Sequence, residues 1–577
     1  MGLTMGLTAY CDGERFMGFR PPPNRVAIRR QDEGSTRKTL LKAQNSSTLP
    51  SKWDSREMGW VSSVKNQGNV GACWAFAACA AIETQLLKAE RGEWDLSEKN
   101  MVNLHGFEPG FSVGGDSDMA AAYLLRWGGA VAETNDVYVE TKSKWTGSKP
   151  LNPALHIQNV IWVPTRENVY DNDTLKKAIM YHGAVSASIF WNESYVSTSN
   201  YYCDASVGVN HAVAVVGWDN NYPSNNFNRT PGGNGAYLIK NSWGTNKGDK
   251  GYYWVSYYDE CFAMWLDSYV FIPATDDEND DAVYGYDKLG CLYPPITCDL
   301  VAAAFTSSWN EELAAVGVYS SMDDCPYEVS VYTNVTRTTS TMSPNPLAGG
   351  ALACTFSGTL ETAGFTTVHL PAPVRLADRT NFVVVYKQTT TDPDYWISYS
   401  CNYEDGTPYS RVTANPGNTY RGNVSKGKTT WTDLATEDAI ACLKAYTRST
   451  IAATDTPSES DDGTATLEWL ANTNATLYAE TAETFGAIAG LVGANGRSLY
   501  ASCLAGFDPA NAEDGELEVY ISVTNNIPYL SWKPDLGSTS RKYTVFGTES
   551  LYPLNWQIVT PENKTDMKFF RVTVEMP

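Results

Sequence analysis

The stretch NQGNVGACWAF, residues 66–76, contains the start of the strongest helix pattern in the chain and a cysteine at that start. The apolar pattern runs from Cys73 to a stop signal at Gly92, which predicts a helix of about five turns. The partial positive charge and unpaired N–H groups of a helix N-terminus favour a thiolate over a thiol. Cys73 is therefore a candidate nucleophile. A lone cysteine on an apolar helix is more often a small buried residue, as we expect for Cys79.

Two further motifs supply partners for this cysteine. His211 opens an apolar strand pattern 138 positions downstream (211 − 73), and Asn241 ends another strand pattern 30 positions later (241 − 211). Alone, the histidine would be interpreted as a core or edge residue and the asparagine as a turn residue. The order Cys, His, Asn at these spacings, with Cys-Trp opening a helix, is typical of papain and the cathepsins.

From Leu49 to about Pro273 the chain resembles the papain family of cysteine peptidases. The resemblance rests on LPSKWDSR (residues 49–56), the helix-opening motif, LSE (96–98), the motifs around the histidine and the asparagine, and Gly251-Tyr252. It implies an α+β catalytic domain with a helical half and a β-barrel-like half. Strands are predicted at 184–190, 212–217, 236–240 and 251–257, after the helices, and this order agrees with an α+β domain.

The resemblance implies a role for each catalytic position. Cys73 attacks the peptide carbonyl, and His211 takes up the thiol proton and later protonates the leaving amine. Gln67 and the Cys73 backbone N–H would form the oxyanion hole, Asn241 would orient the imidazole, and Trp243 would shield that hydrogen bond from water. Outside the family pattern, Gln67 would be interpreted as a surface loop amide.

A glycine pair is expected to bind the substrate backbone. Gly114 and Gly115 would pair with an extended peptide as an added strand. Asp116 stands where the family more often has an aromatic residue, so it either gives the pocket a basic or polar preference or points to water. The other substrate-contacting positions that the resemblance implies are Ser188, Val209, Asn210, Ala212, Trp243 and Leu266.

The twelve cysteines are too few for a disulfide scaffold, and no Cys/His cluster has metal-ligand spacing, so we expect no metal and no cofactor. Two family disulfides are missing, since Val70, Ser112 and Leu104 stand where the family often has cysteines. The resemblance implies that the third disulfide is kept as Cys203–Cys261. The alternative is two buried thiols.

The rest of the chain is predicted to form further segments. Residues 1–48, with a Pro run and a basic cluster, are interpreted as a leader or pro-segment that is removed near residues 45–49, its basic cluster lying across an acidic cleft rim. An acidic solvated linker is expected at 274–282 and a second linker at 448–465. The β-rich segment 283–447 resembles the lectin-like domain attached to papain-like peptidases of many bacteria. Residues 466–577 are predicted to be a C-terminal β-rich domain that ends in a strand at 569–574. We expect both β-rich domains to be sandwich-like.

Length and charge limit the function further. A chain of 577 residues is too long for one core, and its formal net charge of −22 disfavours nucleic acids and anionic membranes as partners. No apolar run approaches the roughly 18 residues of a membrane-spanning helix, and the N-terminus lacks the pattern of a signal peptide. Because the resemblance and the scattered cysteines favour an extracellular protein, we still expect a secreted or cell-surface location.

The prediction is a cysteine endopeptidase with accessory domains for attachment or for glycan or protein binding. Internal cleavage is expected because the sequence after Gly115 runs directly into a helix, without an insertion that could block one end of the cleft. Two alternatives stay open. One is a catalytically silent adhesin, against which the complete set of catalytic positions argues, and the other is acyl transfer to an amine by the same residues.

Overall fold

The chain is described by a computed structural model. The ranges that the structure describes are 11–12, 15–16, 18–21, 49–110, 113–139, 150–275, 280–296, 298–337, 339–342, 344–388, 397–404, 408–449, 518–524, 527–533, 542–548, 557–558 and 569–575. Most of the predicted pro-segment and of the second linker therefore lies outside the described residues, as does the basic cluster of the pro-segment.

Four α-helices lie in the described part of the papain-like segment. They are α2 (Cys73–Lys88), α3 (Glu98–Leu104), α4 (Ser117–Leu125) and α5 (Asp173–His182). Helix α2 begins at Cys73, as predicted, and ends four residues before Gly92 (92 − 88), which has a φ of +84°. Alanines make up much of α2, and their small side chains let the helix lie deep in the core, with buried residues on all its faces.

The four strands predicted in this segment are present as β5 (Val185–Ile189), β8 (His211–Asp219), β9 (Ala236–Lys240) and β10 (Tyr252–Ser256). They belong to a sheet of 13 strands within the described residues, in the order β12-β26-β15-β18-β4-β11-β5-β8-β9-β10-β7-β6, with β3 paired to β8. The remaining strands of this sheet are β3 (Lys52–Asp54), β4 (Ile157–Val163), β6 (Val196–Ser197), β7 (Asn200–Tyr201), β11 (Ser268–Pro273), β12 (Ala282–Gly285), β15 (Glu311–Ser320), β18 (Gly364–Leu376) and β26 (Leu443–Ser449).

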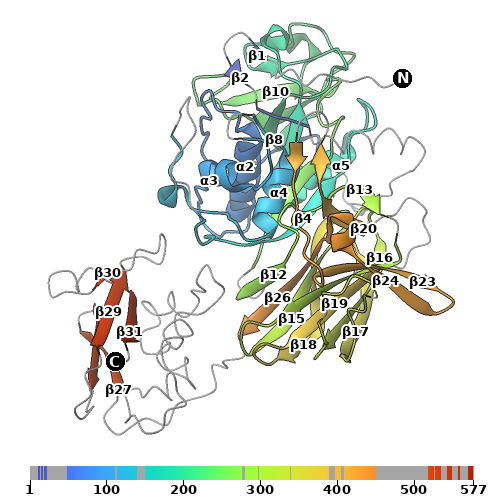
Figure 1. Cartoon of the computed structure of the whole chain (residues 1–577). Helices are drawn as coiled ribbons and strands as arrows, with labels where there is room; N and C mark the ends of the chain where they lie inside the picture. Colours follow the sequence, from blue (N-terminus) through green and yellow to red (C-terminus); the bar gives the residue numbers. More distant parts are fainter. Residues whose placement is uncertain are drawn as a thin grey trace.

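The second half of the described chain is a β-sandwich. A six-stranded sheet, β17-β16-β19-β14-β23-β24, packs on the β12, β15, β18 and β26 end of the large sheet through a core that includes Val316, Val329, Val384 and Leu443. Figure 1 shows these strands below α2, α3 and α4. The other strands here are β13 (Leu292–Ile296), β14 (Leu300–Thr306), β16 (Cys325–Thr333), β17 (Ala351–Leu360), β19 (Asn381–Gln388), β20 (Ile397–Cys401), β21 (Tyr403–Glu404), β22 (Pro408–Ser410), β23 (Thr419–Ser425), β24 (Lys428–Asp433) and β25 (Ala439–Ala441).

The two halves share a sheet and a core. Gly364 at the start of β18 pairs with Ile161 of β4, and a Cβ at Gly364 would lie 2.0 Å from the Val160 oxygen, so this position must be glycine. Behind the junction, Trp162 and Phe365 belong to the same buried cluster as the apolar residues of α2. The segments that the sequence presents as separate domains are therefore packed together without a gap.

Both linker predictions need correction where they can be compared with the structure. Asp280, from the acidic run, is 3% exposed, and it pairs with Arg448 at 2.7 Å between Oδ1 and Nε. Residues 448–449, predicted to begin the second linker, are the last residues of β26. A run of charges is usually solvated, but here a facing arginine neutralises the acidic group that the strands bury. Residues 276–279 lie outside the described part.

Near the C-terminus the structure describes strand backbones only. β27 (Glu518–Thr524) pairs with β28 (Ile527–Lys533), and β29 (Lys542–Thr548) pairs with β30 (Gln557–Ile558) and β31 (Phe569–Glu575). The strand predicted at Phe569–Val574 corresponds to β31. That residues 466–577 form a separate sandwich-like domain stays a prediction.

Candidate active site

The candidate nucleophile is buried at the start of α2. Cys73 is 0% exposed, and its thiol interacts with the backbone of Ala212, the residue after His211 at the start of β8. Burial raises the pKa of the Cys73 thiol to about 12, although the backbone N–H groups of Ala212 and Trp74 act in the opposite direction. Burial therefore opposes the thiolate that the helix N-terminus is expected to favour.

The imidazole of His211 is held in one tautomer. Its Nε2 lies 2.9 Å from Oδ1 of Asn241, and the same oxygen accepts the backbone N–H of Ser242 at 2.8 Å. Since that amide atom is an acceptor, Nε2 must carry the proton, which leaves Nδ1 as the basic nitrogen. The ring of Trp243 stacks on the imidazole with 4.7 Å between centroids, and it is buried.

Gln67 is fixed from several sides. Its backbone N–H donates to the Ser242 carbonyl at 2.8 Å, and its Oε1 accepts the Ser242 hydroxyl at 2.6 Å. Its Nε2 donates to the Val70 carbonyl at 3.0 Å. An amide nitrogen carries two N–H groups, so Nε2 can donate two hydrogen bonds. Ser242 directly follows Asn241, but nothing in the sequence indicated this linking role.

Asn210 and Trp191 support the side of the site that carries His211 and Trp243. The Asn210 side chain accepts the backbone N–H of Trp191 at 2.7 Å and donates to the Trp191 carbonyl at 3.0 Å. The Trp191 ring meets the Trp243 ring edge-on, with 4.9 Å between centroids. The side chain of Asn210 therefore holds the backbone of Trp191, and the Trp191 ring packs against Trp243, which stacks on His211. Trp191 was missed, because an isolated tryptophan after a strand carries no local signal of its neighbours.

Residues 18–21 of the chain lie in the cleft. The N–H of Phe19 donates to the Asn210 carbonyl at 3.1 Å, the N–H of Arg20 donates to the Gly115 carbonyl at 2.9 Å, and Gly115 donates to the Gly18 carbonyl at 3.1 Å. The glycine pair thus binds an extended backbone, as predicted for a substrate, but the bound segment is the protein's own.

Both glycines of the pair are required by this close packing. Gly114 has a φ of +87°, and a Cβ there would lie 2.3 Å from the Gly18 carbonyl oxygen. A Cβ at Gly115 would lie 2.6 Å from the ring of Trp74, which follows the nucleophile on α2. Any side chain at either position would close the groove or displace the helix.

The side chain of Phe19 lines a pocket next to α4, the helix that follows the glycine pair. Two predicted pocket residues, Ser188 and Leu266, line it, together with Ser117, Asp118, Asp267 and Tyr269. The Tyr269 hydroxyl donates to Asp118 at 2.5 Å, so the pocket contains a fixed carboxylate. Of the other predicted positions, Ala212 contacts the nucleophile and Val209 packs on the core.

Asp116 occupies a position that neither sequence-based alternative describes. Its carboxylate is 0% exposed, so it does not point to water, and it is not among the residues that line the pocket around Phe19. Oδ1 accepts the Met119 N–H at 3.0 Å, which makes Asp116 the N-cap of α4. Oδ2 accepts the hydroxyl of Tyr409, a residue of β22, at 2.7 Å.

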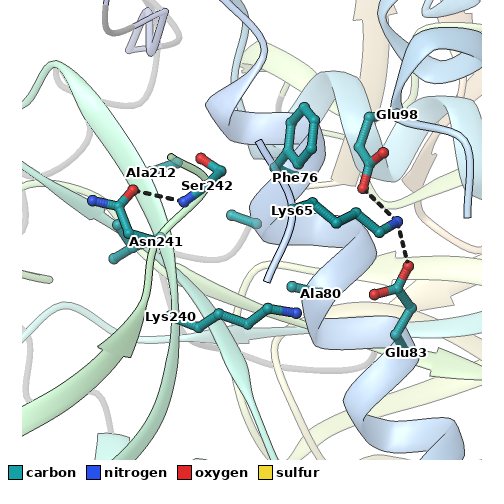
Figure 2. Close-up of a pocket in the computed structure, with 11 residues that line it drawn as sticks. Lys65, Phe76, Ala80, Glu83, Glu98, Ala212, Lys240, Asn241 and Ser242 are labelled. Atoms are coloured by element: carbon teal, nitrogen blue, oxygen red, sulfur yellow. Dashed lines mark hydrogen bonds and ion pairs between the residues drawn. The ribbon is translucent and has the colours of Figure 1, made fainter. Parts of the chain in front are cut away.

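A cluster of charged side chains lines one pocket together with Asn241 and Ser242 of the active site (Figure 2). Lys65 Nζ contacts Glu83 at 2.8 Å, Asp95 at 2.6 Å and Glu98 at 2.9 Å. Burial opposes the Lys65 ammonium, but Glu98 and Glu83 outweigh this effect and raise the Lys65 pKa. Burial raises the pKa of Glu98 to about 8, although the charge of Lys65 acts to lower it. Burial lowers the pKa of Lys240 to about 8.

The predicted disulfide partners lie side by side. The Sγ atoms of Cys203 and Cys261 both contact the Ala205 carbonyl, at 3.3 and 3.1 Å, and both backbone N–H groups donate to Asp259. Both cysteines are buried free thiols in this structure, so the predicted bond between them is not formed here and stays a prediction. Mass spectrometry of the oxidised protein can detect the bond directly.

Comparison with known families agrees with this geometry. Residues 49–269 match the family described as papain family cysteine protease, and residues 283–447 match the lectin like domain. Cathepsin S of Mus musculus is 34% identical over 260 residues, which cover 43% of this chain and 72% of the cathepsin. Cathepsin K of the same species is 31% identical over 245 residues, covering 41% and 67%. The chain belongs to the papain family of cysteine proteases and carries a lectin-like domain.

One solved structure is similar over both segments. The cysteine protease and lectin-like domains of Cwp84, a surface layer associated protein of Clostridium difficile, match with a TM-score of 0.59 and 23% identity, covering 71% of this chain and 96% of that one. At this identity the match supports the fold: a papain-like domain followed by a lectin-like β-rich domain. Among the described helices, none has the length and apolar composition that crossing a membrane requires.

Proposed function

We propose that this papain-family protease cleaves internal peptide bonds through a thioester formed on Cys73. The observation that carries the proposal is the contact of His211 Nε2 with Asn241 Oδ1, at 2.9 Å. It leaves Nδ1 as the base for a thiol that lies against the neighbouring residue. A third group that orients the base is the arrangement that activates weak nucleophiles in other hydrolases.

The proposed reaction has two stages. Nδ1 of His211 takes the thiol proton, the sulfur bonds to the peptide carbonyl carbon, and the negative charge moves to the oxygen. When the C–N bond breaks, the same nitrogen returns the proton to the leaving amine, and an acyl-thioester stays on Cys73. Water then gives a proton to Nδ1, attacks the thioester and releases the acid and the thiol.

The oxyanion role of Gln67 can be tested with two variants. Gln67→Ala should lower kcat by roughly 10²–10³-fold, because one preorganised donor to the oxyanion is removed. Gln67→Glu keeps an oxygen that can accept the Ser242 hydroxyl but replaces the donor with an acceptor, so we expect a loss of similar size. Steady-state kinetics with a fluorogenic peptide measure both. Wild-type kcat for Gln67→Glu would show that only the link to Ser242 matters.

Internal cleavage is proposed because Gly115 is followed at once by Asp116 and α4, with no inserted segment across the groove. Digestion of an unfolded protein, with the new termini mapped by mass spectrometry, should give fragments from internal cuts. Release of only dipeptides or single residues from one end would contradict the proposal. Products carrying an added amine in place of water would favour acyl transfer, and no products at all would favour the silent adhesin.

We further propose that residues 1–48 are an inhibitory pro-segment. Residues 18–20 occupy the groove along Gly115, and the Cys73 thiol, whose pKa burial raises to about 12, is 0% exposed while they are bound. Cleavage near residues 45–49 should readmit water, lower this pKa and speed alkylation of Cys73 by iodoacetamide at neutral pH. The uncut chain is the control. Equal alkylation rates before and after cleavage would contradict the proposal.

The ligand of the lectin-like domain and the location of the protein are proposed from the family matches and the composition. A polypeptide is the substrate that a papain-family protease implies, and the lectin-like domain suggests a carbohydrate or another surface ligand. The association of Cwp84 with a surface layer and the acidic composition of this chain support a secreted or cell-surface protein. Glycan-array binding of the whole chain would test the carbohydrate ligand.

A further inference from the structure

We propose that Tyr409, from the lectin-like domain, is a positioning residue for the substrate-binding strand of the protease. This inference rests on the proposed peptidase function and adds a residue to it. The two segments meet at the rim of the cleft, where β22 lies against the loop that ends in Gly114 and Gly115.

The contact is specific and fully buried. Tyr409 is 0% exposed, its hydroxyl donates to Asp116 Oδ2 at 2.7 Å, and its carbonyl accepts the N–H of Glu108 at 3.0 Å. Its ring meets Phe107 edge-on, with 5.2 Å between centroids. A single residue therefore contacts both the beginning and the end of the loop from Phe107 to Asp116.

Tyr409 is itself fixed to its own domain. The next residue, Ser410, donates its hydroxyl to the Cys401 carbonyl at 2.8 Å. Cys401 ends β20, which pairs with β13 and β25. The hydroxyl of Tyr409 is thus carried by the sheet framework of the lectin-like domain, which can hold the loop in place.

The hydrogen bond between Tyr409 and Asp116 affects substrate binding because Asp116 directly follows Gly115. Asp116 follows the glycine whose N–H and carbonyl bind the extended segment in the cleft, and it caps α4. Burial, together with the nearby charge of Asp118, raises the pKa of Asp116 to about 7. A carboxylate in such surroundings depends on its hydrogen-bond donors, so loss of the Tyr409 hydroxyl should displace this residue and the Gly115 backbone with it.

The test separates substrate binding from chemistry. Tyr409→Phe, measured on the active enzyme, should raise KM for a peptide substrate roughly ten-fold while kcat stays within about two-fold, because the glycine strand binds the peptide but does not react. The rate of Cys73 alkylation by iodoacetamide, which is too small to use the strand, should not change. Tyr286→Phe is the matched control, since that hydroxyl donates to the Ala304 carbonyl at 2.7 Å inside the lectin-like domain.

A double-mutant cycle makes the assignment more specific. In an Asp116→Asn background, the effect of Tyr409→Phe on KM should shrink below about three-fold. The asparagine side chain is neutral, so loss of the Tyr409 hydroxyl no longer deprives a buried charge of a hydrogen-bond donor. If Tyr409→Phe does not fold, Asp116→Ala replaces it, with the same expected rise in KM.

Two outcomes overturn the inference: an unchanged KM in the folded variant, or alkylation that slows in parallel with hydrolysis. Wild-type enzyme that hydrolyses no peptide would instead overturn the proposed function. The two failures are therefore distinguishable.

Discussion

Replacement of Cys73 by alanine is expected to abolish peptide hydrolysis, with kcat/KM falling by at least about 10⁴-fold. No thioester can form without the sulfur, and the remaining groups can only bind and polarise the substrate. The geometry around the residue explains why no neighbour should replace it. The thiol lies against Ala212, beside the one histidine whose tautomer Asn241 fixes.

Cys79→Ala is the matched control for this experiment. Cys79 lies on the same helix and is equally buried, but it is six positions from the nucleophile (79 − 73), so its loss should leave activity per folded molecule unchanged. Hydrolysis of a fluorogenic peptide and labelling by an electrophilic peptide inhibitor measure both variants. Unchanged hydrolysis by Cys73→Ala would mean that another residue is the nucleophile.

Replacement of Lys65 by methionine is expected to lower the free energy of unfolding by roughly 3–5 kcal/mol, the usual cost of removing one partner from a buried ion pair. Glu83 and Glu98 have side chains that are 1% exposed, and both would lose their cation. Lys52→Met is the control, because its pair with Glu57 is exposed and should contribute about 1 kcal/mol or less. Urea unfolding measures both variants.

The pH dependence of the free energy of unfolding provides a second test of the Lys65→Met prediction. Burial already raises the pKa of Glu98 to about 8 while Lys65 lowers it, so removal of the lysine should raise it further. The folded variant then binds more protons than the unfolded chain above the ordinary pKa of a glutamate, and its stability falls as the pH rises. Wild type loses stability in the same way up to the pKa of its own Glu98, so the deficit relative to wild type should be constant at lower pH and grow only above about pH 8. A deficit that is constant with pH would contradict this account.

Much of the fold was predictable because its signals are local. The start of α2 at Cys73 and the strands β5, β8, β9 and β10 each follow from a pattern within a short window of sequence. β4 and β11 were not predicted, although they connect the catalytic sheet to the lectin-like strands. The pairing of β4 with β18 joins residues about 200 positions apart, such as Val160 and Phe365, which no local pattern reveals.

The sequence by itself determined the set of catalytic groups, since the residue types and their order are enough to indicate a thiol, a base and an orienting amide. Only the tertiary structure decided their states and partners. Burial of Cys73 raises the pKa of its thiol, and Asp116 is bound by Tyr409, 293 positions away. Burial and long-range hydrogen bonds arise when distant segments pack together, so the charge and orientation of a side chain are properties of that packing.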